Sequence, residues 1–343
     1  MTHRTKNILY SAILFLSLFA VFMYRRASGP TPLMLSGSTM GTTYHITYFD
    51  EQQRDFKQSI DSLLQVFNQS LNTYLPDSEI TRFNKGDSSF KFELPYFFPV
   101  LERSQQITAA SQGAFDPTVM PLVNAWGFGP EKQTEPNSHQ IDSILKFTGF
   151  EKIGFNKDSV WKFDPRVQLD FSAIAKGYGV DAVANLLASL GITDMFVEIG
   201  GEVVARGKNI RKEKSWEVGI LDPNSTPAQQ SFKAFVLLED RALATSGNYF
   251  NYKEKDGKKY SHTIDPITGY PVQRSILSAS VFASDCMTAD AWATACMVMG
   301  HEQAIPLLEA QKEISAILFF TAPDGALKIY SSPALQKQIT FAD

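Results

Sequence analysis

One stretch decides the fold around it: Leu169-Asp170-Phe171-Ser172-Ala173-Ile174-Ala175-Lys176-Gly177-Tyr178-Gly179-Val180-Asp181. A strand-like run over residues 160–169 leads into it, and a helix with few large side chains in its first turn is expected to follow. The first N–H groups of a helix lack partners within the helix and carry the positive end of its dipole. Lys176 adds a full charge at this end, so the stretch predicts a site that suits phosphate.

Three residues of this stretch have a structural and a functional interpretation. Asp170 precedes the predicted helix and serves either as its N-cap or as a binding group. Gly177 and Gly179 each cost about 1 kcal/mol relative to alanine within a helix. Their presence predicts that something approaches the helix backbone closely, either another part of the chain or a ligand.

The composition describes a globular protein with a large core. The chain has 343 residues, of which 44% are hydrophobic and 12% aromatic, and this length allows one large domain or two ordinary ones. Its net charge of −4 gives no sign of a basic surface for nucleic acid. A nucleic-acid partner is therefore not expected.

The N-terminus carries the one long apolar run of the sequence. Ile8 to Tyr24 holds 17 residues without a charge, which is short for a membrane-spanning helix and long for the apolar part of a signal peptide. Basic residues stand on both sides, so charge does not fix the orientation. We predict an uncleaved membrane anchor within residues 1–30 and an exported domain over 31–343. A cleaved signal, or a cytoplasmic domain on a membrane tether, is the alternative.

The two cysteines are predicted to be free thiols. Cys286 and Cys296 lie in a segment that reads as one helix. Ten residues of helix span about 15 Å, which is beyond the reach of a disulfide.

Strands and helices follow one another without strict alternation, which favours an α+β fold of mixed sheets and packed helices over a doubly wound sheet. An amphipathic helix is expected over Glu51–Leu71. A hairpin with a glycine turn is expected over Met195–Ala205. The small residues of Leu243–Tyr249 are expected to form a loop.

Asp290 and Thr294 are the first pair with potential chemistry. They are four residues apart on a predicted helix and so share one face. A carboxylate and a hydroxyl are hard oxygen ligands that suit Mg²⁺ rather than zinc. The structural alternative is that both residues cap the helix.

His262 is the most promising proton acceptor among the histidines. It lies in a turn-rich loop with Asp265 close by in sequence, and an imidazole titrates near neutral pH. The alternative is a solvated loop histidine without a role.

A dinucleotide fingerprint, G-x-G-x-x-A, occurs at Gly177–Ala182, with Glu198 about 20 residues further on. It supports a nicotinamide-dependent oxidoreductase as an alternative function. The context is poor, because the glycines fall within the predicted helix and not in the turn before it. The patterns of P-loop NTPases, zincins and α/β-hydrolases are absent from the sequence.

Taken in order, six motifs resemble those of the ApbE family, the FAD:protein FMN transferases. The resemblance runs from about Leu35 to the C-terminus. The motifs are Met40-Gly41-Thr42, Gly113-Ala114-Phe115-Asp116-Pro117, Leu169 to Gly177, Gly200-Gly201, Ser261 to Gly269, and Ala289 to Thr294.

The resemblance implies an ApbE-like α+β fold and a bacterial enzyme anchored in the inner membrane, with its catalytic domain in the periplasm. Such an enzyme binds FAD and Mg²⁺ and transfers FMN to a threonine or serine hydroxyl of a target flavoprotein, releasing AMP. Some members hydrolyse FAD instead, and a flavin carrier without transfer is a further alternative. Many members carry a lipoprotein cysteine after the signal, and this chain has none there.

The resemblance also assigns roles to individual residues. Our own candidate for the catalytic base, chosen for its chemistry and not by the resemblance, is His262, with Asp265 orienting it. Mg²⁺ is expected to bind the Ala173 carbonyl and the side chains of Asp290 and Thr294. The residues expected to line the FAD site are Met40, Tyr74, Ala114, Phe115, Asp116, Asp170, Lys176 and the segment from His262 to Ile264.

Overall fold

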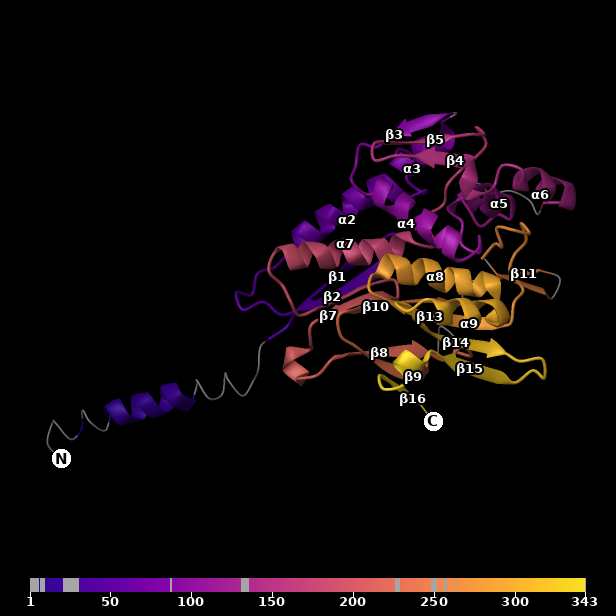
Figure 1. Cartoon of the computed structure of the whole chain (residues 1–343). Helices are drawn as coiled ribbons and strands as arrows, with labels where there is room; N and C mark the ends of the chain where they lie inside the picture. Colours follow the sequence, from indigo (N-terminus) through magenta and orange to yellow (C-terminus); the bar gives the residue numbers. More distant parts are fainter. Residues whose placement is uncertain are drawn as a thin grey trace.

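An antiparallel sheet crosses the middle of the molecule (Figure 1). The computed structural model describes residues 6, 10–20, 31–86, 88–130, 136–225, 229–247, 252–255, 258–261 and 263–342. The strand order in this sheet is β1-β2-β6-β7-β10-β13-β14-β15. The bounds are β1 Leu33–Thr39, β2 Thr42–Tyr48, β6 Met195–Ile199, β7 Glu202–Arg206, β10 Arg241–Gly247, β13 Ile276–Ala283, β14 Ser315–Thr321 and β15 Leu327–Ser331.

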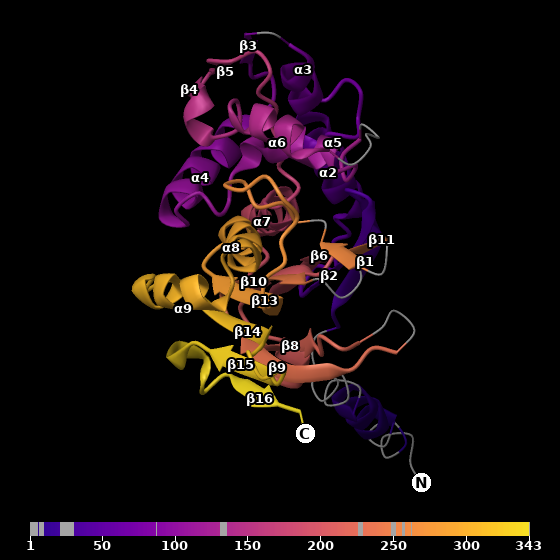
Figure 2. The same cartoon turned by 90° about the vertical axis from the view of Figure 1, so that its right-hand side faces the viewer.

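Two helices lie side by side on one face of this sheet, α7 (Ala175–Ser189) and α8 (Cys286–Met299) (Figures 1 and 2). Nearly every residue of α8 is buried, because it lies between strands β10 and β13 below and the helices above. Cys286 and Cys296 are both buried and free, which confirms the prediction from their spacing.

A smaller sheet of order β16-β9-β8 covers the opposite face (Figure 2). Its strands are β8 (Trp216–Leu221), β9 (Phe232–Leu238) and β16 (Ile339–Phe341). A separate apolar cluster fills the space between the two sheets, where Trp216 of β8 packs with Phe282 and Phe319 of the central sheet.

A largely helical lobe caps the other side of α7 and α8 (Figure 1). Phe171 joins the organising stretch to this lobe, since its ring meets that of Phe97 edge-on at 5.5 Å. The lobe elements are α2 Lys57–Leu71, α3 Glu79–Lys85, β3 Ser89–Lys91, α4 Phe97–Ala110, η1 Pro117–Val119, α5 Met120–Ala125, α6 Ser138–Leu145, η2 Phe150–Lys152, β4 Ile153–Phe155 and β5 Ser159–Lys162. The remaining elements are η3 Ile210–Lys212, β11 Tyr252–Lys255, β12 Lys258–Ser261, α9 His301–Ala310 and η4 Pro333–Leu335.

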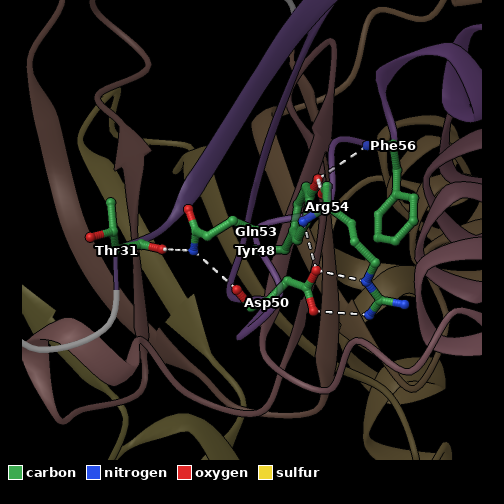
Figure 3. A network of polar contacts seen from close by, with 6 residues as sticks. All are labelled: Thr31, Tyr48, Asp50, Gln53, Arg54 and Phe56. Carbon is green, nitrogen blue, oxygen red and sulfur yellow. Dashed lines mark hydrogen bonds and ion pairs between the residues drawn. The ribbon is translucent and has the colours of Figure 1, made fainter.

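The connection from β2 to α2 is fixed by a polar network (Figure 3). Arg54 donates from its guanidinium to both carboxylate oxygens of Asp50, at 2.8 and 2.9 Å. The Tyr48 hydroxyl donates to the Arg54 carbonyl at 2.7 Å and accepts from the Phe56 N–H at 3.3 Å. Because this network holds the chain in a turn, α2 begins at Lys57 and not at Glu51 as the periodicity predicts.

Helices α7 and α8 each place a carboxylate on the start of the other. Asp181 of α7 accepts from the backbone N–H groups of Cys286 and Met287, both at 2.8 Å. Asp290 of α8 accepts from the Gly177 N–H at 2.9 Å. Two N–H groups at the start of α8 and one in the first turn of α7 are thereby satisfied by the neighbouring helix. Burial raises the pKa of Asp181 to about 7, although the two N–H groups oppose that rise.

The two helix glycines face protein and not a ligand. A Cβ on Gly177 would lie 2.2 Å from the Cys286 carbonyl oxygen, so the backbones of α7 and α8 touch there. A Cβ on Gly179 would lie 2.4 Å from the terminal methyl of Met40. The G-x-G-x-x-A spacing therefore serves helix packing, which removes the basis for the nicotinamide interpretation.

Two local expectations are wrong. The strand-like run over 160–169 ends at Lys162, and the Asn84 side-chain amide takes the place of a neighbouring strand by bonding the Leu169 N–H and C=O at 2.7 and 2.8 Å. The expected loop at Leu243 instead continues strand β10 through Gly247. Its small residues fit a strand because α8 packs directly on it.

The N-terminal prediction is only partly covered by the structure. Residues 10–20 are helical, and the rest of the predicted 8–24 span lies outside the described residues. Within the part of the chain that the structure describes, no helix has both the length and the apolar character needed to cross a bilayer.

Alanine substitutions at the two helix glycines should have different effects. Both remove a helix-interior glycine, a gain of about 1 kcal/mol each. Gly177→Ala forces two backbones apart, so we expect a net loss of about 2 kcal/mol in the free energy of unfolding. Gly179→Ala displaces only a flexible methionine end and should stay within about 1 kcal/mol of the wild type. Urea denaturation measures both, and equal effects would contradict the close helix contact.

Candidate active site

A cavity of about 950 Å³ opens where the helical lobe, the central sheet and the small sheet meet. Its lining comes from segments far apart in sequence: the loop around 73–74, the segment 114–130 that includes η1 and α5, the start of α7, the β6–β7 turn, the end of β10, the loop around 263–266, and part of α8. Residues Gly219–Leu221 of β8 form its wall on the side of the small sheet. The cavity therefore extends past one end of the central sheet, from the helix layer to the small sheet.

The turn before α7 supplies oxygens to this cavity. Helix α7 begins at Ala175, and its N-cap residue Ile174 makes no side-chain cap. Asp170 is not the cap, because its Oδ1 accepts from the N–H and the hydroxyl of Ser172, at 2.8 and 2.5 Å. Burial raises the pKa of Asp170 above its usual range, although the Ser172 donors oppose this.

The Ala173 carbonyl has no helical donor within the described residues. In a continuous helix the Gly177 N–H would donate to it, but this N–H donates to Asp290 instead. Ala173 lines the cavity together with Asp290 and Thr294. Asp290 is buried, at 3% exposed. The Thr294 hydroxyl lies 3.3 Å from the Ser246 hydroxyl on β10. The three residues that the sequence assigns to a metal are thus brought to one cavity.

An ion pair between a buried glutamate and a partly exposed lysine stands beside these oxygens. Lys176 Nζ lies 2.7 Å from Glu202 Oε1, where Glu202 opens strand β7 directly after the Gly200-Gly201 turn. Burial raises the pKa of Glu202, and the Lys176 charge opposes that rise. Burial lowers the pKa of Lys176, but the Asp290 and Glu202 carboxylates outweigh it and leave the pKa above its ordinary value. The ammonium therefore stays charged next to the cavity.

Ala114, Phe115 and Asp116 also line the cavity, at the end of α4. The Asp116 carboxylate is directed into its own loop, since Oδ1 accepts from the N–H and hydroxyl of Thr118 and Oδ2 from the Phe150 N–H. These three bonds leave it little capacity for a ligand, so the segment presents mainly its backbone and apolar surface to the cavity.

The loop that carries the predicted base is anchored to the helical lobe. Ile264 lines the cavity and is buried against Leu122 and Ile141. Asp265 Oδ1 accepts from the backbone N–H groups of Ile267 and Thr268, at 2.9 and 3.3 Å, and so shapes its own turn. His262 lies outside the described residues.

Two of the expected FAD residues lie at or beyond the edge of the cavity. Tyr74 is 66% exposed and lines the rim. Met40 lies outside the lining, in a shallower hollow between the β1–β2 turn and α2. Its methyl group packs toward Gly179, so Met40 supports α7 from behind.

Sequence reasoning missed Glu202, Thr245 and Ser246, all of which line the cavity. A carboxylate that directly follows a Gly-Gly turn and precedes the apolar run Val203-Val204-Ala205 is the signal that marks Glu202. The two hydroxyl residues lie in the segment that was expected to be a loop.

The donor set fits a hard cation. Among the described residues, no group of three or more His, Cys, Asp or Glu side chains is placed to hold a metal. The predicted set contains one carboxylate, one hydroxyl and one backbone carbonyl, and Mg²⁺ usually takes few protein ligands beside water and phosphate oxygens. The arrangement thus suits a cation that is bound together with a phosphate ligand.

Known proteins share this architecture. The solved structure of the flavin transferase ApbE from Vibrio cholerae matches with a TM-score of 0.81 at 37% identity, over 90% of this chain and 99% of that chain. The apo flavinyl transferase ApbE of Pseudomonas stutzeri matches with a TM-score of 0.79 at 31% identity, over 90% and 97%. The fold is therefore that of the flavin transferases.

Sequence comparison agrees with the structural match. The model of the ApbE family matches residues 40–318. The FAD:protein FMN transferase of Vibrio cholerae is 39% identical over 309 residues, which cover 88% of this chain and 91% of that protein. The one of Haemophilus influenzae is 37% identical over 318 residues, covering 89% and 91%. The chain belongs to the ApbE family, as the six motifs indicated.

Removing the Lys176 charge should make stability depend on pH through Glu202. The folded pKa of Glu202 is raised, so its contribution to stability is present below the unfolded pKa and is lost as pH rises through the folded pKa. Lys176→Met raises that pKa further. We therefore expect the free energy of unfolding of the variant to fall below that of the wild type by an amount that grows from about pH 5 to about pH 8 and reaches about 2 kcal/mol. Urea denaturation without added metal or FAD measures it.

The matched control is the double variant Lys176→Met/Glu202→Gln. Since the glutamine carries no charge, its stability deficit should be nearly independent of pH. A deficit that is equally steep in the single and double variants would contradict electrostatic pairing of these two residues.

Proposed function

We propose that this chain transfers FMN from FAD to a threonine or serine hydroxyl of a target flavoprotein and releases AMP. The observation that carries this proposal is the single cavity in which a charged lysine, a helix start and three oxygen ligands meet beside apolar walls. Membership of the ApbE family supports it, because the relatives are named FAD:protein FMN transferases.

FAD is proposed to lie along the cavity. The apolar walls at Ala114, Phe115 and Ile264 suit the flat flavin ring, and Tyr74 at the rim suits stacking. Lys176 and the start of α7 suit the diphosphate. Asp170 is proposed to bond a polar edge of the ligand, since Asp116 is already occupied by its own loop.

Mg²⁺ is the proposed cation, held by the Ala173 carbonyl, Asp290 and Thr294. When bound, it would supply positive charge at the phosphoryl oxygens, where charge stabilisation is the main catalytic term in such transfers. Lys176 adds its own charge from the same side of the cavity. Glu202 keeps that lysine in place through their 2.7 Å contact.

The reaction requires one proton transfer and one bond exchange. The acceptor oxygen forms a bond to the FMN phosphorus, the bond from that phosphorus to the AMP oxygen breaks, and the hydroxyl proton passes to a base. We propose His262 as this base. A His262→Ala variant that transfers FMN at the wild-type rate would exclude the role.

We further propose that the chain is held at the bacterial inner membrane by residues 1–30, with residues 31–343 in the periplasm. The uncharged run at 8–24 supports the anchor. Recovery of the chain in a soluble fraction, with its N-terminus beyond residue 30, would contradict it.

The transfer is tested directly by mass. Purified enzyme is incubated with FAD, MgCl₂ and an exported flavoprotein that carries an acceptor threonine, and the acceptor is weighed. We expect the acceptor to gain the mass of one FMN and AMP to appear in equal amount. FMN and AMP without acceptor gain would mean hydrolysis, and tight FAD binding without AMP would mean a carrier.

Asp290→Asn should abolish metal-dependent transfer without unfolding the protein. The asparagine oxygen can still accept from the Gly177 N–H, but the charge that a cation needs is lost, so we expect a fall of about a hundredfold or more. In the wild type we expect MgCl₂ to raise the melting temperature when FAD is present. In Asp290→Asn this rise should vanish.

Asp285→Asn is the matched control on the same helix. Asp285 caps α8 through the Thr288 N–H at 2.8 Å and does not line the cavity. Asparagine caps a helix as well as aspartate, so stability should fall by less than about 1 kcal/mol while transfer and the MgCl₂ effect persist. If Asp290→Asn behaves like this control, the metal assignment is wrong.

A further inference from the structure

Strand β8 has an unpaired edge within the described residues. It ends the order β16-β9-β8, and its backbone pairs only with β9. An exposed strand edge presents a row of free N–H and C=O groups that can pair with another chain. Proline is absent from the strand, and Glu217 is its one charged residue, so little blocks such pairing.

The register shows which groups face this edge. The Leu237 N–H of β9 donates to the Gln338 carbonyl, on the β16 side, at 2.9 Å. Leu237 is opposite Glu217, so these two do not exchange hydrogen bonds. At the other end, the Asp222 N–H donates to the Ser231 carbonyl of the β9 side at 2.9 Å. By the two-residue alternation, Glu217, Gly219 and Leu221 direct their N–H and C=O groups outward.

The open edge borders the cavity. Gly219 and Leu221 are both partly exposed and line it, whereas the outer edges of β1 and β15 contribute nothing to its lining. The free backbone groups of β8 are thus next to the space where the flavin donor is proposed to lie.

The outer face of the small sheet is apolar beside this edge. The rings of Phe232 and Phe235 are 5.5 Å apart and are 47% and 37% exposed. Phe232 folds over Gly219, where an added Cβ would lie 2.4 Å from its ring. Leu237 extends the same face and is 38% exposed. An extended segment on β8 would place alternate side chains beside those of β8 and against the Phe232 ring where it folds over Gly219.

We propose that the segment of the target protein that carries the acceptor hydroxyl binds as an added strand along the open edge of β8. This inference rests on the proposed function, since it identifies how the second substrate of that reaction is held. Main-chain hydrogen bonds to Glu217, Gly219 and Leu221 hold the segment, and the Phe232 ring that folds over Gly219 contacts its side chains. The acceptor hydroxyl is thereby delivered into the cavity from the small-sheet side.

Backbone pairing suits this task because the acceptor must present one hydroxyl to a phosphorus inside a cavity. An extended strand is narrow, and its alternate side chains point to opposite faces. One side chain can therefore point into the cavity while its neighbours stay outside. Strand pairing also tolerates varied sequences in the target segment, because it depends on main-chain hydrogen bonds.

The first test is amide hydrogen exchange of the wild-type enzyme, read residue by residue, with and without the acceptor protein used in the mass assay. We expect the Gly219 and Leu221 amides to exchange fast alone and to slow at least about tenfold with acceptor. The Val218 and Ile220 amides, paired to β9, should change little. The Phe341 amide on the opposite edge of the small sheet should also stay unchanged.

The second test places proline on the edge. Glu217→Pro removes one outward N–H without touching the bonds to β9, and Glu217→Ala removes the same side chain but keeps the N–H. We expect the proline variant alone to raise KM for the acceptor by about tenfold. FAD binding, measured by flavin fluorescence, should match the wild type in both. Phe341→Pro, on the far edge, should leave KM unchanged.

The outcomes separate this inference from the proposed function. Transfer with no slowing of exchange along β8, or equal effects of the proline and alanine variants, would overturn strand pairing while leaving the transferase intact. Absence of both FAD binding and transfer in the wild type would overturn the proposed function itself. Protection at Gly219 and Leu221 together with the proline effect supports the proposal.

Discussion

The exchange of carboxylates between α7 and α8 is the constraint on which the site depends. Asp181 satisfies the start of α8, and Asp290 satisfies the start of α7. Each bond is to a buried N–H group, whose loss would cost about 1–3 kcal/mol. Because both helices are fixed at these ends, the Ala173 carbonyl and the Thr294 hydroxyl reach one cavity. The same contact explains why Gly177 has no side chain.

The three layers contribute different parts of the site. The helix layer brings charge and oxygen atoms, the lobe above it brings apolar walls, and the small sheet below brings the edge of β8, which is unpaired among the described residues. The end of β10 joins them, since Thr245 and Ser246 line the cavity between α8 and β8. A ligand with an apolar ring, a charged diphosphate and a protein co-substrate matches this order of surfaces.

Much of this could be predicted from the sequence, where the signal is local. The hairpin around Gly200-Gly201 and the helix that keeps Cys286 and Cys296 apart follow from spacing alone. Most of the residues that the motifs predicted for the FAD and metal sites also line the cavity. Other features depend on contacts between distant segments. The Asn84 side chain takes the place of a strand partner for Leu169. Thr118 and Phe150 donate hydrogen bonds to the Asp116 carboxylate. The Met40 side chain packs toward Gly179.

The two thiols of α8 have a consequence for the redox behaviour of the folded protein. Burial raises the pKa of the Cys286 thiol well above its ordinary value and that of Cys296 to about 12. Only a thiolate attacks a disulfide or reacts readily with oxidants, and neither side chain forms one at neutral pH. The folded chain therefore holds no disulfide that a reducing compartment could break, and burial protects both thiols from oxidation once the chain has folded.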